Sequence, residues 1–218
     1  MNREDAWNIL CEHTKTEPLR KHALAVEAAM RAYARKYSAD EVRWAVVGLL
    51  HDFDFEMHPT AEEHPVKGAD ILRERGVPED IVYAVLCHAD YLGLDRKTPM
   101  DRAIYAVDEL TGFITAVALV RPRKSIDEVD VAAVREKTKD KGFARNVNRD
   151  DITKGAEQLG VDLDEQDRLC HRIAQAGCFR ARDCRRRRHR LNRRLAAITP
   201  PQKRGLTAAA STLAGLAG

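Results

Sequence analysis

The chain has 218 residues, of which 44% are hydrophobic and 33% charged, and its net charge is +3 at pH 7. This composition supplies a packed core and is typical of a water-soluble protein. The apolar runs are shorter than the roughly 20 residues that span a bilayer. The first residues, MNREDAWNIL, are charged where a secretory signal would be apolar. Five cysteines without a CxxC pair favour reduced thiols. We therefore expect a cytoplasmic protein that does not enter the membrane.

The net charge conceals an asymmetry between two parts of the chain. Residues 1–168 carry a net charge of −8, whereas residues 169–218 carry +11, with nine arginines between positions 180 and 194. Dense like charge opposes folding, so we expect a folded domain over 1–168 and a disordered basic tail over 169–218. Three interpretations of this tail stay open: an altered reading frame, a solvated extension, or a nucleic-acid-binding segment. Phe179 is its only aromatic residue, which gives little support for stacking on bases.

Helix start and stop signals punctuate residues 16–160. Thr16 with Pro18 predicts the start of one helix, and Ser38 with Glu41 predicts a capping box before the apolar segment Val42–Leu50. Later helices are opened by a proline or a capping residue and are ended by a glycine or a proline. The predicted starts are Pro65, Pro78, Thr98 with Asp101, Ser125 with Glu128, and Arg149; the predicted ends are Gly76, Val120 and Gly160. No alternating strand pattern is found, so we predict an all-α fold.

A set of histidines and aspartates lies at helix ends or on apolar helix faces. Its members, in chain order, are His22, His51, Asp52, His64, His88 and Asp108. A buried, unpaired carboxylate is costly, and imidazole and carboxylate together suit divalent metals. Each residue alone has a simpler interpretation: a core histidine, or an ion pair such as Asp108 with Arg102. Several helices that each offer one inward ligand are a common way to build a metal site, and the ordered set indicates one here.

The segments that carry these residues resemble the HD superfamily of metal-dependent phosphohydrolases. They are KHALAV, GLLHDFDFE, HPVKGADIL, AVLCHAD and YAVDELTG, within residues 15–120. DELTGFI, ALVRPRKS and DKGFARNVNRDDI are similar to an HDIG-like subgroup of predicted hydrolases and extend the likeness to about residue 160. The resemblance implies a helical bundle and an enzyme that hydrolyses a nucleotide or another small phosphate ester. It also implies one or two divalent transition metals, Mn, Fe, Co or Zn, with Mg²⁺ less suited to histidine ligands.

The resemblance assigns roles to individual residues. The four-ligand site of the superfamily corresponds to His22, His51, Asp52 and Asp108, and Asp52 stands at the position that bridges two metals. The extra histidines of dinuclear members correspond to His64 and His88. The catalytic residues expected from these positions are Asp52, His64 and His88. Lys67 is added on chemical grounds, as a cation near the charge that develops on the phosphate, with solvated surface charge as its alternative interpretation. Further candidate cations for the phosphate are Arg121, Arg123, Lys124, Lys139 and Lys141, and candidates to support ligands or to transfer protons are Asp54, Glu56 and His58.

Two departures and two alternatives accompany this hypothesis. The chain reads HDFDF where phosphate-binding members often have a lysine after the HD pair, and the GYP signature of cyclic-dinucleotide phosphodiesterases is absent after His88. The same ligand order also resembles the diiron oxygenases of the superfamily. A binding module with a vestigial metal site, in which the arginine-rich tail contacts nucleic acid by releasing counterions, is the other alternative. The oligomeric state stays open.

Overall fold

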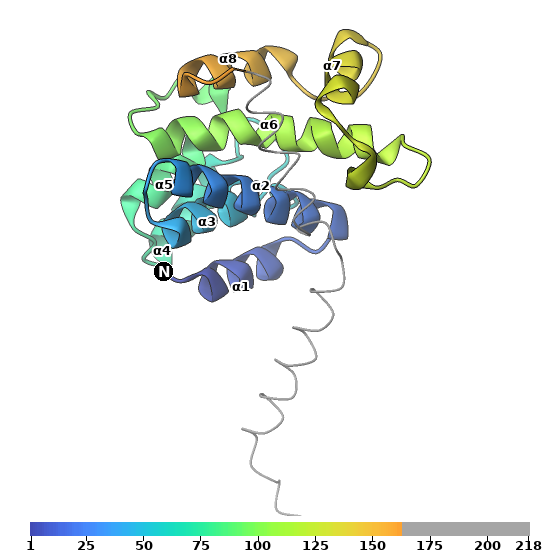
Figure 1. Cartoon of the computed structure of the whole chain (residues 1–218). Helices are drawn as coiled ribbons and strands as arrows, with labels where there is room; N and C mark the ends of the chain where they lie inside the picture. Colours follow the sequence, from blue (N-terminus) through green and yellow to red (C-terminus); the bar gives the residue numbers. More distant parts are fainter. Residues whose placement is uncertain (163–218) are drawn as a thin grey trace, which may run out of the picture. The chain divides into compact units, whose positions relative to one another are not determined.

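The computed structural model describes residues 1–162, and all regular structure in this part of the chain is helical, which confirms the predicted fold class (Figure 1). The arginine-rich segment and the boundary expected after residue 168 lie outside the described residues. Within the described part, no helix has the length and hydropathy needed to cross a bilayer.

Helix α1 (Arg3–His13) precedes the first helix predicted from the sequence. It begins at a capping box in which Asn2 and Asp5 exchange side-chain and backbone hydrogen bonds, at 3.0 and 3.1 Å. Arg3 donates two hydrogen bonds, of 2.5 and 2.6 Å, to the buried carboxylate of Glu27 on the next helix, α2 (Glu17–Lys36). A two-pronged arginine–carboxylate pair is directional as well as strong, so it fixes α1 against the next helix.

Helices α2 (Glu17–Lys36) and α3 (Glu41–Leu50) form an antiparallel pair. Their backbones approach so closely at Gly48 that a Cβ there would lie 2.7 Å from the Glu27 Cα. The capping box predicted from Ser38 and Glu41 is wrong. Ser38 has a positive φ of 51° in the turn after α2, and Asp40 caps α3 by accepting hydrogen bonds from the two amides at 42 and 43. Asp40 stands directly before the helix, where a short carboxylate reaches those amides.

Helices α4 (Val66–Glu74) and α5 (Glu79–Leu86) follow a loop, and the short 3₁₀ turn η1 (Asp90–Leu92) leads towards α6 (Pro99–Leu119). The predicted capping box of Thr98 and Asp101 is confirmed, with both reciprocal hydrogen bonds present. Helix α6 is the long central element in Figure 1, and it packs against α2 on one side and α8 (Arg149–Leu159) on the other.

Beyond α6, the predicted start at Ser125 and Glu128 is wrong in its extent. Ser125 caps only the 3₁₀ turn η2 (Ile126–Glu128), and α7 (Val131–Lys139) begins after Asp130, whose side chain accepts a 2.7 Å hydrogen bond from the Ala133 amide. Helix α8 (Arg149–Leu159) ends at Gly160, which has a φ of 65°, as the sequence predicts.

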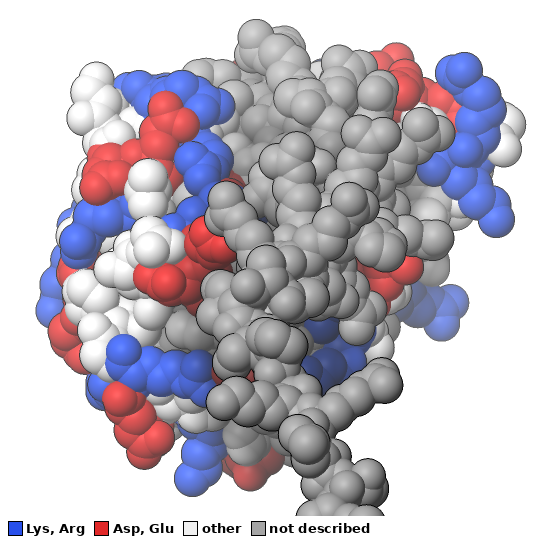
Figure 2. All heavy atoms as spheres, turned by 90° about the horizontal axis from the view of Figure 1, so that it is seen from below, with Lys and Arg blue, Asp and Glu red and all other residues white. Residues whose placement is uncertain are grey.

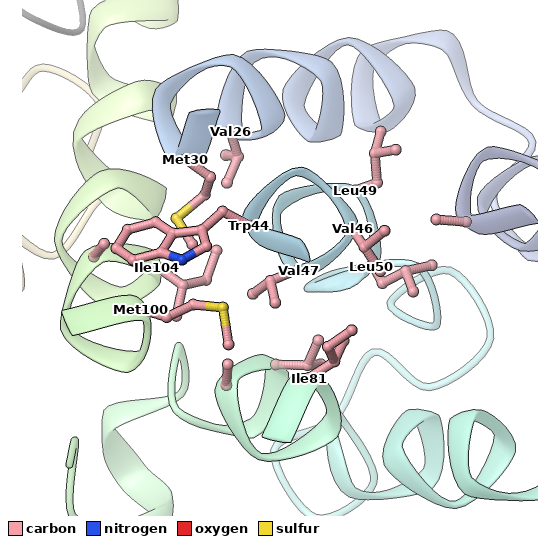
Figure 3. Packing of buried hydrophobic residues seen from close by; sticks show 14 of the residues in the cluster. Val26, Met30, Trp44, Val46, Val47, Leu49, Leu50, Ile81, Met100 and Ile104 are labelled. Carbon is pink, nitrogen blue, oxygen red and sulfur yellow. The ribbon is translucent and has the colours of Figure 1, made fainter. Parts of the chain in front are cut away.

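The hydrophobic core has two parts. The larger joins α1 to the first half of α6, with Trp44, Met30 and Val47 at its centre (Figure 3). The smaller joins the second half of α6 to η2, α7 and α8, around Phe113 and Val117. The larger core thus surrounds the helices that carry the histidines and aspartates, and gives them a fixed framework.

On the face seen in Figure 2, basic and acidic side chains intermingle over the described part of the surface. Elsewhere on or near the surface, the described residues include ion pairs such as Arg75 with Glu12 and Arg73 with Glu79. Exposed pairs of this kind contribute about 0–1 kcal/mol each, so the fold is stabilised mainly by its apolar core.

Candidate metal centre

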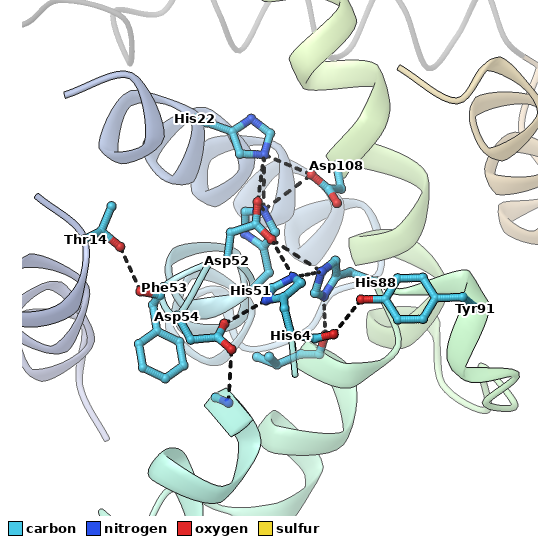
Figure 4. A network of polar contacts seen from close by, with 12 residues as sticks. Thr14, His22, His51, Asp52, Phe53, Asp54, His64, His88, Tyr91 and Asp108 are labelled. Atoms are coloured by element: carbon cyan, nitrogen blue, oxygen red, sulfur yellow. Dashed lines mark hydrogen bonds and ion pairs between the residues drawn. The ribbon is translucent and has the colours of Figure 1, made fainter. Parts of the chain in front are cut away.

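Asp52 lies at the middle of the cluster, and its two carboxylate oxygens face different neighbours (Figure 4). Oδ2 lies 3.4 Å from His51 Nε2 and 3.9 Å from His22 Nε2. Oδ1 lies 3.2 Å from His64 Nε2 and 3.4 Å from His88 Nε2. One side chain therefore divides the cluster into two groups of donor atoms.

The first group unites three helices. His22 on α2 lies with Nε2 3.1 Å from the Nε2 of His51, at the end of α3, and 2.9 Å from Oδ1 of Asp108 on α6. His51 Nε2 is itself 3.3 Å from the same Asp108 oxygen. Together with Oδ2 of Asp52, these atoms form the first group.

The second group lies between the loop after α3 and the end of α5. His64 stands just before α4, His88 just after α5, and their Nε2 atoms are 3.1 Å apart. Within each group, all the donor atoms lie within 4.8 Å of one another. The structure thus brings together all six residues that the sequence analysis assigned to a metal site.

Hydrogen bonds at the opposite ring nitrogen set the orientation of three histidines. Nδ1 of His51 lies 2.9 Å from the Gly48 carbonyl, and Nδ1 of His88 lies 2.6 Å from the Val85 carbonyl. Both carbonyls are three residues back, in the last turn of a helix, where a carbonyl can accept from a side chain. Nδ1 of His64 lies 2.9 Å from the Asp54 carboxylate. Because these Nδ1 atoms donate, each neutral ring presents the lone pair of Nε2 to the cluster.

This donor set fits a cation. Lone pairs of imidazole nitrogens face one another and face carboxylate oxygens at 2.9–3.4 Å, which is repulsive unless a proton or a metal ion lies between them. Nitrogen and oxygen donors in this mixture suit Mn, Fe, Co or Zn better than Mg²⁺, which prefers an all-oxygen shell.

In the metal-free protein, the same contacts shift the pKa values of the ligands. Burial alone would lower the pKa of His51, but the charges of Asp52 and Asp108 raise it well above its ordinary value. Burial likewise opposes protonation of His64, yet its hydrogen bonds to Asp52 and Asp54 raise its pKa to about 9. Burial would raise the pKa of Asp108, but the neighbouring histidines hold it well below its usual range. The cluster therefore attracts positive charge.

The remaining candidates occupy varied places. Lys67 is exposed on α4, one turn beyond His64, and Arg102 donates to backbone carbonyls instead of pairing with Asp108. The other candidate cations follow α6 or lie at the end of α7; they are Arg121, Arg123, Lys124, Lys139 and Lys141.

The loop after the HD pair has mixed functions. Glu56 accepts hydrogen bonds from the amides of Lys15 and Thr16 and so holds the start of α2, where Thr16 makes no side-chain cap. His58 lies 3.7 Å from Glu63, and Asp54 is fully buried beside His64.

One neighbour was missed: Tyr91 is 57% exposed and donates a 2.6 Å hydrogen bond to the His64 carbonyl. Its spacing from the histidines gave no signal of this contact.

Comparison with known proteins agrees with this geometry. A family model described as HD domain matches residues 19–112. Ribonuclease Y of Oleidesulfovibrio alaskensis is 29% identical over 93 residues, which are 42% of this chain and 18% of that protein. Ribonuclease Y of Desulfotalea psychrophila is 27% identical over 134 residues, which are 60% of this chain and 25% of that protein. The chain therefore spans at most about a quarter of the length of these relatives. No solved structure matches it with significance.

Proposed function

Residues 19–112 are an HD domain, distantly related to the corresponding region of ribonuclease Y, and from this premise we propose that the protein is a metal-dependent phosphohydrolase. The observation that carries the proposal is the division of the Asp52 carboxylate between two groups of donor atoms. A histidine cluster that served only packing would not require two oxygens of one side chain to face two separate sets of lone pairs.

The proposed ligands follow the two groups. One ion is held by His22, His51, Asp52 and Asp108, and a second by Asp52, His64 and His88. A bound divalent ion supplies an activated water at neutral pH and polarises a phosphoryl oxygen. The second group has three protein ligands against four in the first, which leaves more room there for a substrate oxygen.

The protein's own residues orient and confine this chemistry. The carbonyls of Gly48 and Val85 and the carboxylate of Asp54 hold three ligand rings in fixed tautomers. His51 is fully buried and Asp52 is partly exposed, so solvent is excluded from one side of the cluster and can reach it from the other. Lys67, exposed one turn beyond His64, is the cation we propose for the substrate phosphate.

The proposed substrate class is a phosphate ester, either a nucleotide or another small ester. The names of the relatives add a phosphodiester to the substrates worth testing, namely RNA.

The test is hydrolysis of a panel of nucleotides, bis(p-nitrophenyl) phosphate and a short single-stranded RNA, with Mn²⁺, Co²⁺ or Mg²⁺, under air and under argon. Asp52→Ala removes both shared oxygens and should abolish turnover together with metal binding. Asp70→Asn, an exposed residue on α4, is the control and should retain both. Equal rates for Asp52→Ala and the wild type would overturn the proposal, and turnover only with oxygen would favour the oxygenase alternative.

A further inference from the structure

Asp54 is a fully buried carboxylate beside the metal centre that is not one of the six proposed ligands. Its two oxygens have separate partners (Figure 4). Oδ1 lies 2.9 Å from Nδ1 of His64, and Oδ2 accepts a 3.0 Å hydrogen bond from the backbone amide of Gly68. The side chain thus connects the loop after the HD pair with the first turn of α4.

The position of this carboxylate depends on the absence of a side chain at residue 68. A Cβ on Gly68 would lie 2.5 Å from the Asp54 Cγ and 2.6 Å from its Oδ2. Those distances are shorter than any real contact of a Cβ, so any larger residue would displace Asp54. The glycine is therefore needed here for space, because its amide must reach the carboxylate at close range.

The two histidines of the second group are supported differently. His88 uses the neutral carbonyl of Val85, which belongs to its own helix turn. His64 stands before α4, and the support for its Nδ1 comes from a charged group ten residues earlier in the same connection between α3 and α4. A carboxylate partner fixes the tautomer and raises the basicity of a ligand imidazole, and loss of such a partner typically costs about 10–100-fold in metal affinity.

We propose that Asp54 is a positioning residue for His64, and that Asp54 and Gly68 together build the second metal position selectively. This inference rests on the proposed function. The first metal position shares only Asp52 with this network. Its ligand His51 is oriented by a hydrogen bond from Nδ1 to the Gly48 carbonyl and does not depend on Asp54. Loss of the Asp54 carboxylate should therefore lower the affinity for the ion at the second position and leave the affinity at the first position unchanged.

The experiment is titration of the metal-free full chain with Mn²⁺ by calorimetry, with metal content checked by mass spectrometry. The wild type should bind two ions. Asp54→Asn should bind the first ion with unchanged affinity and the second about 10–100-fold more weakly. Gly68→Ala displaces the carboxylate without removing its charge, and should produce the same selective loss. Asp70→Asn removes an exposed carboxylate from the same helix and should match the wild type.

The outcomes separate this inference from the proposed function. A wild type that binds no metal overturns both. Two ions bound with wild-type affinity by Asp54→Asn or by Gly68→Ala overturn the inference alone, and so does an equal loss of both ions. If the variants fail to fold, nitrogen-edited NMR of the wild type with Zn²⁺ bound can show which ring nitrogen of His64 carries the proton. A protected Nδ1 proton is expected, and an Nε2 proton would contradict the inference.

Discussion

The Nε2 atoms of His64 and His88 lie 3.1 Å apart, although 24 residues separate them in the chain. Since Nδ1 of each ring has its own hydrogen-bond acceptor, at Asp54 and at the Val85 carbonyl, the short distance joins two atoms that would repel each other as lone pairs. Burial opposes a charge on His64, but its hydrogen bonds to Asp52 and Asp54 raise its pKa to about 9, so in the metal-free protein a metal ion competes with a proton on this ring.

Metal binding should accordingly release protons. The pKa of His64 is raised to about 9 in the metal-free protein, so below that pH a proton must leave before the ring can bind a metal. The affinity of the second group for Mn²⁺ should therefore rise with pH up to about 9. Calorimetry in two buffers with different ionisation enthalpies measures the released protons. Identical apparent enthalpies in both buffers would contradict the prediction.

Asp108→Asn should remove the first ion selectively. The substitution keeps the shape of the side chain but removes the charge that faces His22 and His51 at 2.9 and 3.3 Å. We expect loss of one bound ion and a fall in kcat of about 100-fold or more, as for other groups that stabilise charge in a transition state. Glu109→Gln, on the same helix turn, tests whether the loss of any carboxylate there is enough to remove a bound ion. A doubly loaded Asp108→Asn protein would show that the first group is not a metal site.

Arg96 should stabilise the conformation of the segment that carries His88. Its guanidinium lies 3.4 Å from the centre of the Tyr105 ring and donates to the Cys87 carbonyl at 2.9 Å and to Asp90 at 3.0 Å. Arg96→Ala should lower the free energy of unfolding by about 1–3 kcal/mol, because it removes stacking and leaves a carbonyl without its donor. Faster hydrogen exchange in residues 87–98 is the expected signature.

Arg96→Lys should not restore that stability, because an ammonium group lacks the planar fork that stacks and donates together. Full rescue by lysine would mean that charge alone accounts for the effect of Arg96.

Gly48→Ala should destabilise the protein although alanine favours helices. The added Cβ would lie 2.7 Å from the Glu27 Cα, and overpacking of this kind costs about 1–3 kcal/mol. Gly112→Ala is the matched control in α6, since its nearest neighbour would be 3.9 Å away. It should be neutral or gain up to about 1 kcal/mol from helix propensity. Urea denaturation compares the two, and equal midpoints would refute the close approach of α2 and α3.

Local chemistry predicted most of the helices. Capping boxes and glycine ends depend on residues near each other in sequence, which is why the start at Thr98 and the end at Gly160 are confirmed. Ser38 was misleading, because a capping motif competes with the turn that precedes it, and the competition is decided by how α2 and α3 pack. Helix α1 was missed, since its apolar face is short and it is fixed by the distant Glu27.

The sequence indicated which residues come together in the candidate metal centre, but not how they separate into two groups of donor atoms. The order of histidines and aspartates along the chain identified all six residues. Which oxygen of Asp52 faces which histidine depends on the crossing of α2, α3 and α6, and sequence spacing contains no information about it. Asp54 was a candidate to support a ligand, but its pairing with His64 could not be predicted, because it also requires a backbone amide fourteen residues away at Gly68.

Gly48 connects the packing of the bundle to the chemistry of the centre. The absence of a side chain at Gly48 permits the close contact between α2 and α3, which carry His22 and His51. The Gly48 carbonyl accepts a hydrogen bond from Nδ1 of His51. The spacing of two ligand helices and the tautomer of a ligand ring therefore depend on a single position. A substitution at Gly48 should therefore cost both stability and metal binding, so the usual replacement of helical glycines in stabilised variants should fail at this position.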